Sequence, residues 1–494
     1  MSLAEEQLLP DLVLLEVMQY LSVDDVFACR LVCKRLEALA RHPNVWRHRR
    51  IDWDRDCPCA VLRLAPCLRA IVCRRHGDGY SPYYSNAAFE TTKCAVTSLD
   101  IEVESAWNGK KSHPQLAHFT QVVRNQIALG RLQHVTVLSG RPGMYLRRQA
   151  DPLRGVDAFW DALAQSSCLQ SLRFLGCVPS ATQPLQSGSS KSSLLLFKCR
   201  LTRKSESFVK AVLAAHTDTL EEVSLRGSLY VDDSAVSSSD TTELLARMPR
   251  LRRLKYDRLS PIDALAACNT LKDVSLFPAP GCSPLSLEQP QSNILKFLSE
   301  ANQLRALSIL FGPGDNIEEL IEATLVSSAL SLEHLSLRGY KAKEVHQVLI
   351  RALPRLPALR QLTLHPGDLE ECDELLLAIT PLSAPALRRL KLISDEDAYN
   401  SGYGCGHHWL HGDAVRATLV VNPLLHIHLW NPNACCSDFE CDPCATLCHL
   451  EAGWNFPGRL VLFAHEPGKC PAPEDHTAGG RKWRSIHMPC NRLQ

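Results

Sequence analysis

A short pattern of apolar and polar positions recurs along most of the chain. It reads apolar-x-x-apolar-x-apolar, and its clearest copies are LQHVTV (132–137), LQSLRF (169–174), LEEVSL (220–225), LRRLKY (251–256), LKDVSL (271–276), LRALSI (304–309), LEHLSL (332–337), LRQLTL (359–364) and LRRLKL (387–392). Weaker copies are VTSLDI (96–101), LLLFKC (194–199) and LLHIHL (424–429). Alternating apolar positions predict a short strand in each copy, with one side buried.

The segments between these strands have a helical pattern. In residues 316–330 and 343–356, apolar residues recur three and four positions apart. From Leu169 to Leu387, successive copies start between 20 residues apart (Leu251 to Leu271) and 33 residues apart (Leu271 to Leu304). A strand and a helix in each repeat, at this period, resemble leucine-rich repeats, and predict a curved solenoid with strands on its concave wall.

A doubly wound α/β enzyme also alternates strands with helices. Two observations oppose that alternative: the same strand motif recurs about ten times, and no glycine-rich phosphate loop follows any copy. The sequence also contains no Ser/His/Asp motif, Walker loop or zinc-protease helix. We therefore predict a protein that is not an enzyme and has no catalytic residues.

The N-terminus has a different pattern, that of short helices. Residues 9–22, LPDLVLLEVMQYLS, carry more apolar surface than the single stripe that a surface helix needs. Pro10 suits the first turn of a helix that runs to about Leu21. Ser22 and Asp25 have the spacing of a capping box, which predicts a second helix that continues as far as His42-Pro43.

Residues 9–46 resemble the F-box family without a gap. The matching positions are Leu9-Pro10, Tyr20-Leu21, Asp24-Asp25, Val32-Cys33-Lys34 and Trp46. The departures are Leu12 where an acid is common, Val23 for the usual Pro and Leu36 for the frequent Trp. A generic helical cap on the repeats is the alternative, but it would explain only one apolar face of the first helix.

The resemblance implies a three-helix unit that docks on a Skp-type adaptor, which connects it to a cullin–RING ubiquitin ligase. The residues that it implies at the adaptor interface, or in its support, are Leu9, Pro10, Leu14, Leu15, Val17, Met18, Leu21, Val32, Cys33 and Trp46. Spacing alone leaves open which of them contact the adaptor and which hold the helices together.

The predicted fold class is therefore α/β, a helical unit followed by a curved leucine-rich-repeat solenoid. The predicted domains are an F-box-like unit (7–52), a linker (53–95), the solenoid (96–430) and a Cys-rich cap and tail (431–494).

The concave wall is the predicted substrate surface, because solenoids use such surfaces for binding. Its candidate substrate-binding residues are Arg226, Arg252, Arg338, His365 and Arg389. For any one of them, an ordinary solvated strand end is the alternative reading.

A group of cysteines near the C-terminus has partial zinc-site spacing. Cys441 and Cys444 are separated by two residues. Cys436 and Cys448 could complete four ligands, with Cys435 and His449 as the alternatives at these two positions. The second pair lacks the usual spacing, so incidental buried thiols remain the alternative to structural zinc. We expect no other cofactor.

Charge and composition indicate which classes of partner to expect and in which cellular compartment. The formal net charge is +1, which gives no global field for nucleic acid or a membrane surface. Seven Arg or Lys residues lie between Arg30 and Arg50, but without interleaved aromatics they favour a solvated face or an acidic partner. Without a signal peptide or an apolar run of about 18 residues, we expect the 21 cysteines to stay reduced in the cytoplasm or nucleus.

The sequence thus predicts a substrate-recognition subunit of an SCF-type ubiquitin ligase. Its partners would be a Skp-type adaptor and a protein substrate of unknown identity, marked for ubiquitination and degradation. The alternative is a leucine-rich-repeat scaffold that uses its helical end for dimerisation or another partner.

Overall fold

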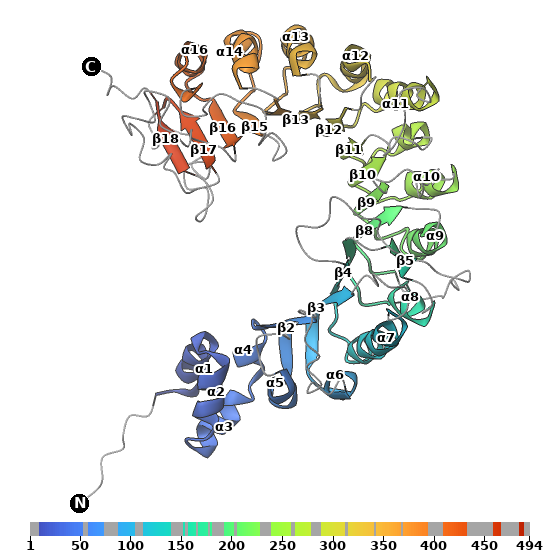
Figure 1. The fold of residues 1–494 in the computed structure, drawn as a ribbon, viewed down its shortest axis with the longest axis vertical. Helices are drawn as coiled ribbons and strands as arrows, with labels where there is room; N and C mark the ends of the chain where they lie inside the picture. Colours follow the sequence, from blue (N-terminus) through green and yellow to red (C-terminus); the bar gives the residue numbers. More distant parts are fainter. Residues whose placement is uncertain are drawn as a thin grey trace, which may run out of the picture. The chain divides into compact units, whose positions relative to one another are not determined.

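The chain forms two compact units, 1–251 and 252–494, in a computed structural model (Figure 1). The structure describes residues 9–52, 58–73, 87–103, 112–139, 152–153, 157–164, 166–175, 178–179, 192–201, 205–227, 239–257, 262–277, 288–311, 315–339, 342–366, 369–393, 409–431, 458–465 and 484–488. Each unit is described by itself.

Unit 1 begins with four short helices. They are α1 (Asp11–Tyr20), α2 (Val23–Arg30), α3 (Lys34–Ala40) and α4 (Pro43–Trp46). The Ser22 hydroxyl accepts a hydrogen bond from the Asp25 N–H at 3.1 Å, which confirms the predicted start of α2. The prediction of one helix from there to His42 was wrong. Cys33 has extended backbone (φ −158°, ψ 163°) and separates α2 from α3, for which its sulfur is the N-cap.

Strands of unit 1 form a parallel row in the order β1, β2, β3, β4, β6, β8, β9. Their bounds are β1 (Arg50–Asp52), β2 (Cys67–Cys73), β3 (Ala95–Val103), β4 (His134–Ser139), β6 (Ser171–Leu175), β8 (Leu196–Leu201) and β9 (Glu222–Gly227). The helices are α5 (Pro58–Leu64), α6 (Ala87–Thr91), α7 (Ser112–Ala128), α8 (Asp157–Ala164), α9 (Glu206–Ala215) and α10 (Ser239–Ala246). A separate pair is β5 (Pro152–Leu153) with β7 (Val178–Pro179).

The strand row starts earlier than the sequence indicated. β2 lies within 53–95, the segment predicted as a linker, and pairs with both β1 and β3. Six of its seven residues are buried, so CLRAIVC lacks the alternation of polar and apolar positions that marks the other strands.

Unit 2 repeats a strand and a helix in the same way. Its parallel strands are β10 (Arg253–Asp257), β11 (Asp273–Phe277), β12 (Ala306–Leu310), β13 (His334–Arg338), β14 (Gln361–His365), β15 (Arg389–Ile393) and β16 (His426–Asn431). β17 (Gly458–Phe463) pairs antiparallel with β16, and β18 (Arg484–His487) pairs parallel with β17. The α-helices are α11 (Glu288–Glu300), α12 (Ile317–Ser328), α13 (Ala342–Ala352), α14 (Asp373–Ala378) and α16 (Asp413–Val421), and 3₁₀ turns are η2 (Asp263–Ala267), η4 (Leu353–Arg355) and η5 (Glu370–Cys372).

All twelve predicted strands are confirmed. Except at 96–101, each strand starts two residues after the first residue of its motif. The leading leucine usually lies in the turn before the strand, where Leu251, Leu271 and Leu304 are fully buried. This leucine therefore belongs to the core without belonging to the sheet.

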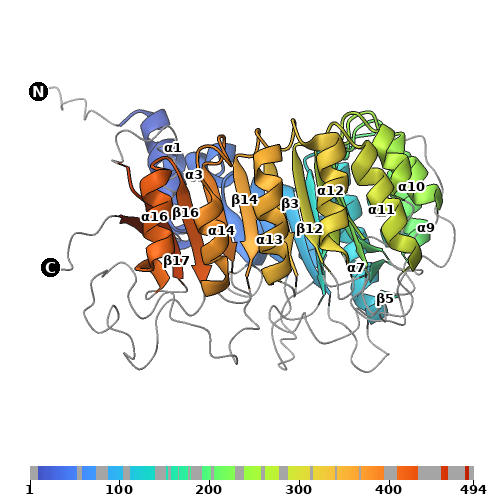
Figure 2. The ribbon, with the colours of Figure 1, turned by 90° about the horizontal axis from the view of Figure 1, so that it is seen from above.

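The helices of unit 2 cover one face of the strand row (Figures 1 and 2). Leu335 and Leu337 on β13 are buried against them, and so are Leu362 and Leu364 on β14. Packed helices need about 8–10 Å of spacing and strands about 4.8 Å, so the row bends away from the helices. The α/β class with strand–helix repeats is confirmed. No helix among the described residues is long and apolar enough to span a membrane.

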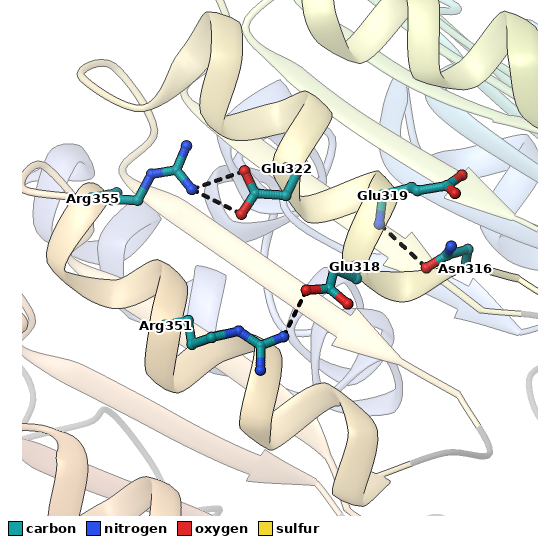
Figure 3. Close-up of polar contacts among 6 residues, drawn as sticks. All are labelled: Asn316, Glu318, Glu319, Glu322, Arg351 and Arg355. Carbon is teal, nitrogen blue, oxygen red and sulfur yellow. Dashed lines mark hydrogen bonds and ion pairs between the residues drawn. The ribbon is translucent and has the colours of Figure 1, made fainter.

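Ion pairs also join neighbouring helical segments of unit 2, as Figure 3 shows between α12 and the consecutive segments α13 and η4. Arg351 lies 2.8 Å from Glu318, and Arg355 donates to both carboxylate oxygens of Glu322 at 2.8 Å. Asn316 caps α12 by accepting from the Glu319 N–H at 3.3 Å. These ion pairs are exposed, so they add little to the free energy of unfolding.

A buried histidine, His216, should make the free energy of unfolding of unit 1 depend on pH. Burial lowers the pKa of His216, whose Nδ1 accepts from the Ser193 N–H at 3.3 Å and whose Nε2 lies 3.3 Å from the Ala164 oxygen. The unfolded state therefore gains a proton first as the pH falls below about 6.5, and the free energy of unfolding decreases by at most about 1.4 kcal/mol per pH unit. Denaturant unfolding between pH 7.5 and 5 measures this. His216→Gln should flatten the dependence; an unchanged slope would contradict the assignment.

Candidate protein-interaction site

Helix α1 carries two apolar stripes. One stripe points into the helical unit, where Leu15 is 7% and Met18 is 2% exposed. The other points outward: Leu12 is 78%, Val17 is 50% and Tyr20 is 82% exposed. Only the first stripe is used in the fold of this unit, so the second is apolar surface available to a partner.

Trp46 holds α1 in place from the inside. Its ring is fully buried, and its Nε1–H donates to the Ala40 oxygen at 2.6 Å. The Arg49 guanidinium lies 5.4 Å from the centre of this ring and donates to the oxygens of Met18 (2.8 Å) and Val45 (2.7 Å). Burial lowers the pKa of Arg49. Arg49 thus links the C-terminal half of α1 to α4.

Arg35 fixes the other end of α1. Its guanidinium donates to the Asp11 carboxylate at 2.7 Å and to the Leu9 carbonyl at 2.5 Å. The start of α3 therefore lies beside the start of α1, which brings the turn before α3 to the same end of the helical unit.

That turn adds a second outward apolar segment. Leu31 is 84% and Val32 is 72% exposed, and Cys33 is exposed as well. The Cys33 sulfur accepts from the Leu36 N–H at 3.5 Å, which helps to hold the turn.

We call these outward residues together the exposed apolar surface. Its members are Leu9, Leu12, Val13, Val17, Tyr20, Leu31 and Val32. Arg30, Lys34 and Arg35 lie beside it in the sequence, so a partner with apolar pockets and acidic neighbours would complement it.

The structure separates the ten residues that the sequence assigned to this interface. Leu9, Pro10, Val17, Val32 and Cys33 are exposed, Leu14 and Leu21 are half-buried, and Leu15, Met18 and Trp46 are buried within the helical unit. The buried three belong to the core that supports this surface rather than to the surface itself. Sequence reasoning did not assign Leu12, Val13, Tyr20 and Leu31, although residues 9, 12, 13, 17 and 20 form a second stripe at helical spacing.

The five candidates on the strand faces are divided between the two units. Arg338 and His365 are register partners on β13 and β14, and Arg389 lies at the start of β15, opposite Gln361. Arg252 is exposed immediately before β10, and Arg226 lies on β9 of unit 1. Of the four candidates in unit 2, only Arg338 and His365 are register partners.

The cysteines of the described residues are all free thiols. Burial, together with Cys67, raises the pKa of the Cys94 thiol to about 12. Within the described ranges, no group of three or more His, Cys, Asp or Glu residues is placed to hold a metal ion. The proposed zinc ligands Cys436, Cys441, Cys444 and Cys448 lie outside the described residues.

One comparison with known proteins supports the assignment of the helical unit. The F-box-like family model matches residues 7–52. Among solved structures, the leucine-rich-repeat-containing protein LegL7 of Legionella pneumophila is 14% identical, with a TM-score of 0.38 over 70% of this chain and 96% of that chain. The Rad7–Elc1 complex of yeast is 14% identical, with a TM-score of 0.22 over 82% of this chain and 98% of that chain. No curated protein sequence matches the chain.

Proposed function

We propose that this chain, which carries an F-box-like domain at residues 7–52, is the substrate-recognition subunit of an SCF-type ubiquitin ligase. The observation that carries the proposal is the exposed apolar surface on this domain. A helical unit that only capped the repeats would not need a second apolar stripe on α1.

The size of this surface supports binding to a Skp-type adaptor. Burying one large aliphatic side chain contributes about 1.5–3 kcal/mol, and association costs about 4–15 kcal/mol. Leu12, Val17 and Val32 together therefore reach the lower end of that cost, and the remaining members add to it.

In this role the chain performs no chemistry itself. The adaptor would connect the helical unit to a cullin and its RING protein, and the strand faces would bind the substrate. Holding a substrate lysine near a charged conjugating enzyme raises its effective concentration, which is how such a subunit would promote ubiquitin transfer.

The experiment is reconstitution of the full chain with a purified Skp-type adaptor. We expect a one-to-one complex in size-exclusion chromatography with light scattering, and a cullin–RING pair that joins only when the adaptor is present. A chain that dimerises through its helical unit and ignores the adaptor would instead favour the scaffold.

A further inference from the structure

Outside the F-box-like domain, exposed large apolar side chains gather at one end of the unit 2 helices. Among the described residues of unit 1 beyond that domain, Leu195 alone is of this kind. In unit 2 they lie in the last turns of α12, α14 and α16 and in the turns that follow. Because β13 to β16 are parallel, the turns that lead into them share one edge of this unit (Figure 2). The residues are Val326, Leu330, Leu377, Leu382, Val420, Val421 and Leu424.

The turns before β14, β15 and β16 have the same form. Each places an exposed proline, Pro357, Pro385 or Pro423, two residues before a leucine that is at most 4% exposed. Proline suits the second position of a turn because its φ is fixed near −65°. Before β11 and β12, that place is taken by the polar residues Asn269 and Asn302. The leucine N–H closes each proline turn, from Leu359 to the Leu356 oxygen at 3.1 Å, from Leu387 to the Ala384 oxygen at 3.2 Å and from Leu425 to the Asn422 oxygen at 3.0 Å.

We call the exposed apolar residues of the turns before β13 to β16 the apolar edge. Leu330 and Leu382 are its largest exposed members, at 82% and 94%. An exposed apolar surface that runs across neighbouring repeats, and is absent from the repeats before them, indicates a contact with a partner. The members are Leu330, Pro357, Leu382, Pro385, Pro423 and Leu424.

Hydrogen bonds hold the apolar edge in place from within. The Ser383 hydroxyl accepts from the Thr380 N–H at 2.9 Å, and this bond closes the loop that presents Leu382. The Asn422 side-chain amide donates to the Ile379 oxygen at 2.5 Å, which joins the turn before β16 to the end of α14. The edge is therefore formed before a partner arrives, which lowers the entropy cost of binding.

Cations line the apolar edge. Arg360 and Arg388 hold equivalent places just before β14 and β15, and the Arg388 N–H donates to the Arg360 oxygen at 2.9 Å. The Arg388 guanidinium lies beside the edge, where it donates to the Pro385 oxygen at 3.1 Å. Within the part of the chain that the structure describes, the exposed Arg360 forms no ion pair. The acid at the equivalent place before β13 is Glu333, which lies 3.6 Å from Arg305. The charge along this edge is therefore positive.

We propose that the apolar edge binds an acidic amphipathic helix of a partner protein. The apolar stripe of such a helix would lie on the leucines and prolines, and its acids would face Arg360 and Arg388. Strands are about 4.8 Å apart and packed helices about 8–10 Å apart, so the four turns extend over about 15–30 Å, the length of about three to five helical turns. This surface is separate from the residues that the proposed function uses, and it does not depend on that function.

Two other occupants complement the apolar edge less well. In a symmetric dimer the same edge of two copies would meet, and Arg360 and Arg388 would face the same arginines. A membrane surface is usually contacted through tryptophan, tyrosine and lysine, and the apolar edge consists of leucine and proline. Both occupants are outcomes of the test.

The test measures the binding of three fluorescent 20-residue peptides to the full chain by anisotropy. All three are amphipathic by design: the first has a leucine stripe flanked by glutamates, the second the same stripe flanked by lysines, and the third the glutamates with glutamine in place of leucine. We expect the first to bind at least about tenfold tighter than either of the others, because only it matches both the apolar residues and the charge. Leu330→Asp with Leu382→Asp should remove that preference. Both side chains are exposed, so the unfolding midpoint should change little.

Arg360→Glu tests the charge separately from the apolar contact. It should reduce the preference for glutamate over lysine flanks by at least about tenfold, because the acids of the peptide would then meet an acid. Lys272→Glu is the matched control. Lys272 has the equivalent place before β11, where the turn carries Asn269 instead of proline, so its replacement should leave the preference unchanged.

Leu12→Asp with Val32→Asp locates the bound peptide. This variant should keep the preference for the glutamate-flanked peptide; its loss would place the peptide on the exposed apolar surface of the F-box-like domain and overturn the proposal. Equal binding of the three peptides, or undiminished binding by Leu330→Asp with Leu382→Asp, would also overturn it. So would a dimer in light scattering that this pair of substitutions abolishes, or tighter binding to phosphatidylserine vesicles than to the first peptide.

Discussion

Leu12→Asp combined with Val32→Asp should reduce the affinity for a Skp-type adaptor by at least about 100-fold, because each loses about 1.5–3 kcal/mol of apolar burial and places a carboxylate in the interface. The same double variant should fold normally. Both side chains are mostly exposed, at 78% and 72%, so the free chain loses no core contact. Calorimetric titration with purified adaptor measures the affinity, and denaturant unfolding measures the stability.

The matched control is Val326→Asp with Leu330→Asp on and just after α12. These side chains are exposed to the same degree, at 71% and 82%, but they lie in unit 2 and outside the F-box-like domain. The adaptor affinity of this control variant should equal that of the unsubstituted chain. Leu15→Asp is unsuitable as a test because Leu15 is buried, and its loss would unfold the helices. Undiminished adaptor binding by the Leu12 and Val32 variant would refute the exposed apolar surface as the adaptor site.

Repetition explains why the strands were predictable and their surroundings less so. The strand motif occurs twelve times, so each copy is supported by the others, and the structure places a strand at every one. β2 occurs once in a fully buried environment, where CLRAIVC has no polar alternation to reveal it. The break between α2 and α3 depends on the extended conformation of Cys33, which hydrophobic spacing does not encode.

The candidate site was predictable as a segment but not residue by residue. The F-box resemblance located the right helices, because order and spacing are properties of sequence. Whether an apolar residue faces inward depends on which neighbours cover it: Met18 is 2% exposed and Leu12, on the same helix, is 78% exposed.

Trp46→Ala should destabilise the helical unit by about 3–5 kcal/mol, the usual cost of truncating a fully buried tryptophan. The substitution also removes the 2.6 Å hydrogen bond to Ala40 and the edge contact with Phe27, whose ring centre lies 6.3 Å away. Since a folded domain is stable by only about 5–15 kcal/mol, a large share of its stability would be lost. Denaturant unfolding of the full chain, followed by circular dichroism, measures the change.

The same variant decides whether Trp46 supports the interface or contacts the adaptor. If Trp46 only supports α1 through Arg49, the apparent adaptor affinity of the variant should follow its folded fraction. The affinity should then be near normal at low temperature. On warming, it should be lost at a lower temperature than in the unsubstituted chain. Tyr20→Ala is the converse control. Tyr20 is 82% exposed, so its loss should change the unfolding free energy by less than about 0.5 kcal/mol while weakening adaptor binding at every temperature. A Trp46→Ala chain that unfolds normally but binds the adaptor poorly would make Trp46 a contact residue, and the inner stripe of α1 would then be part of the interface itself.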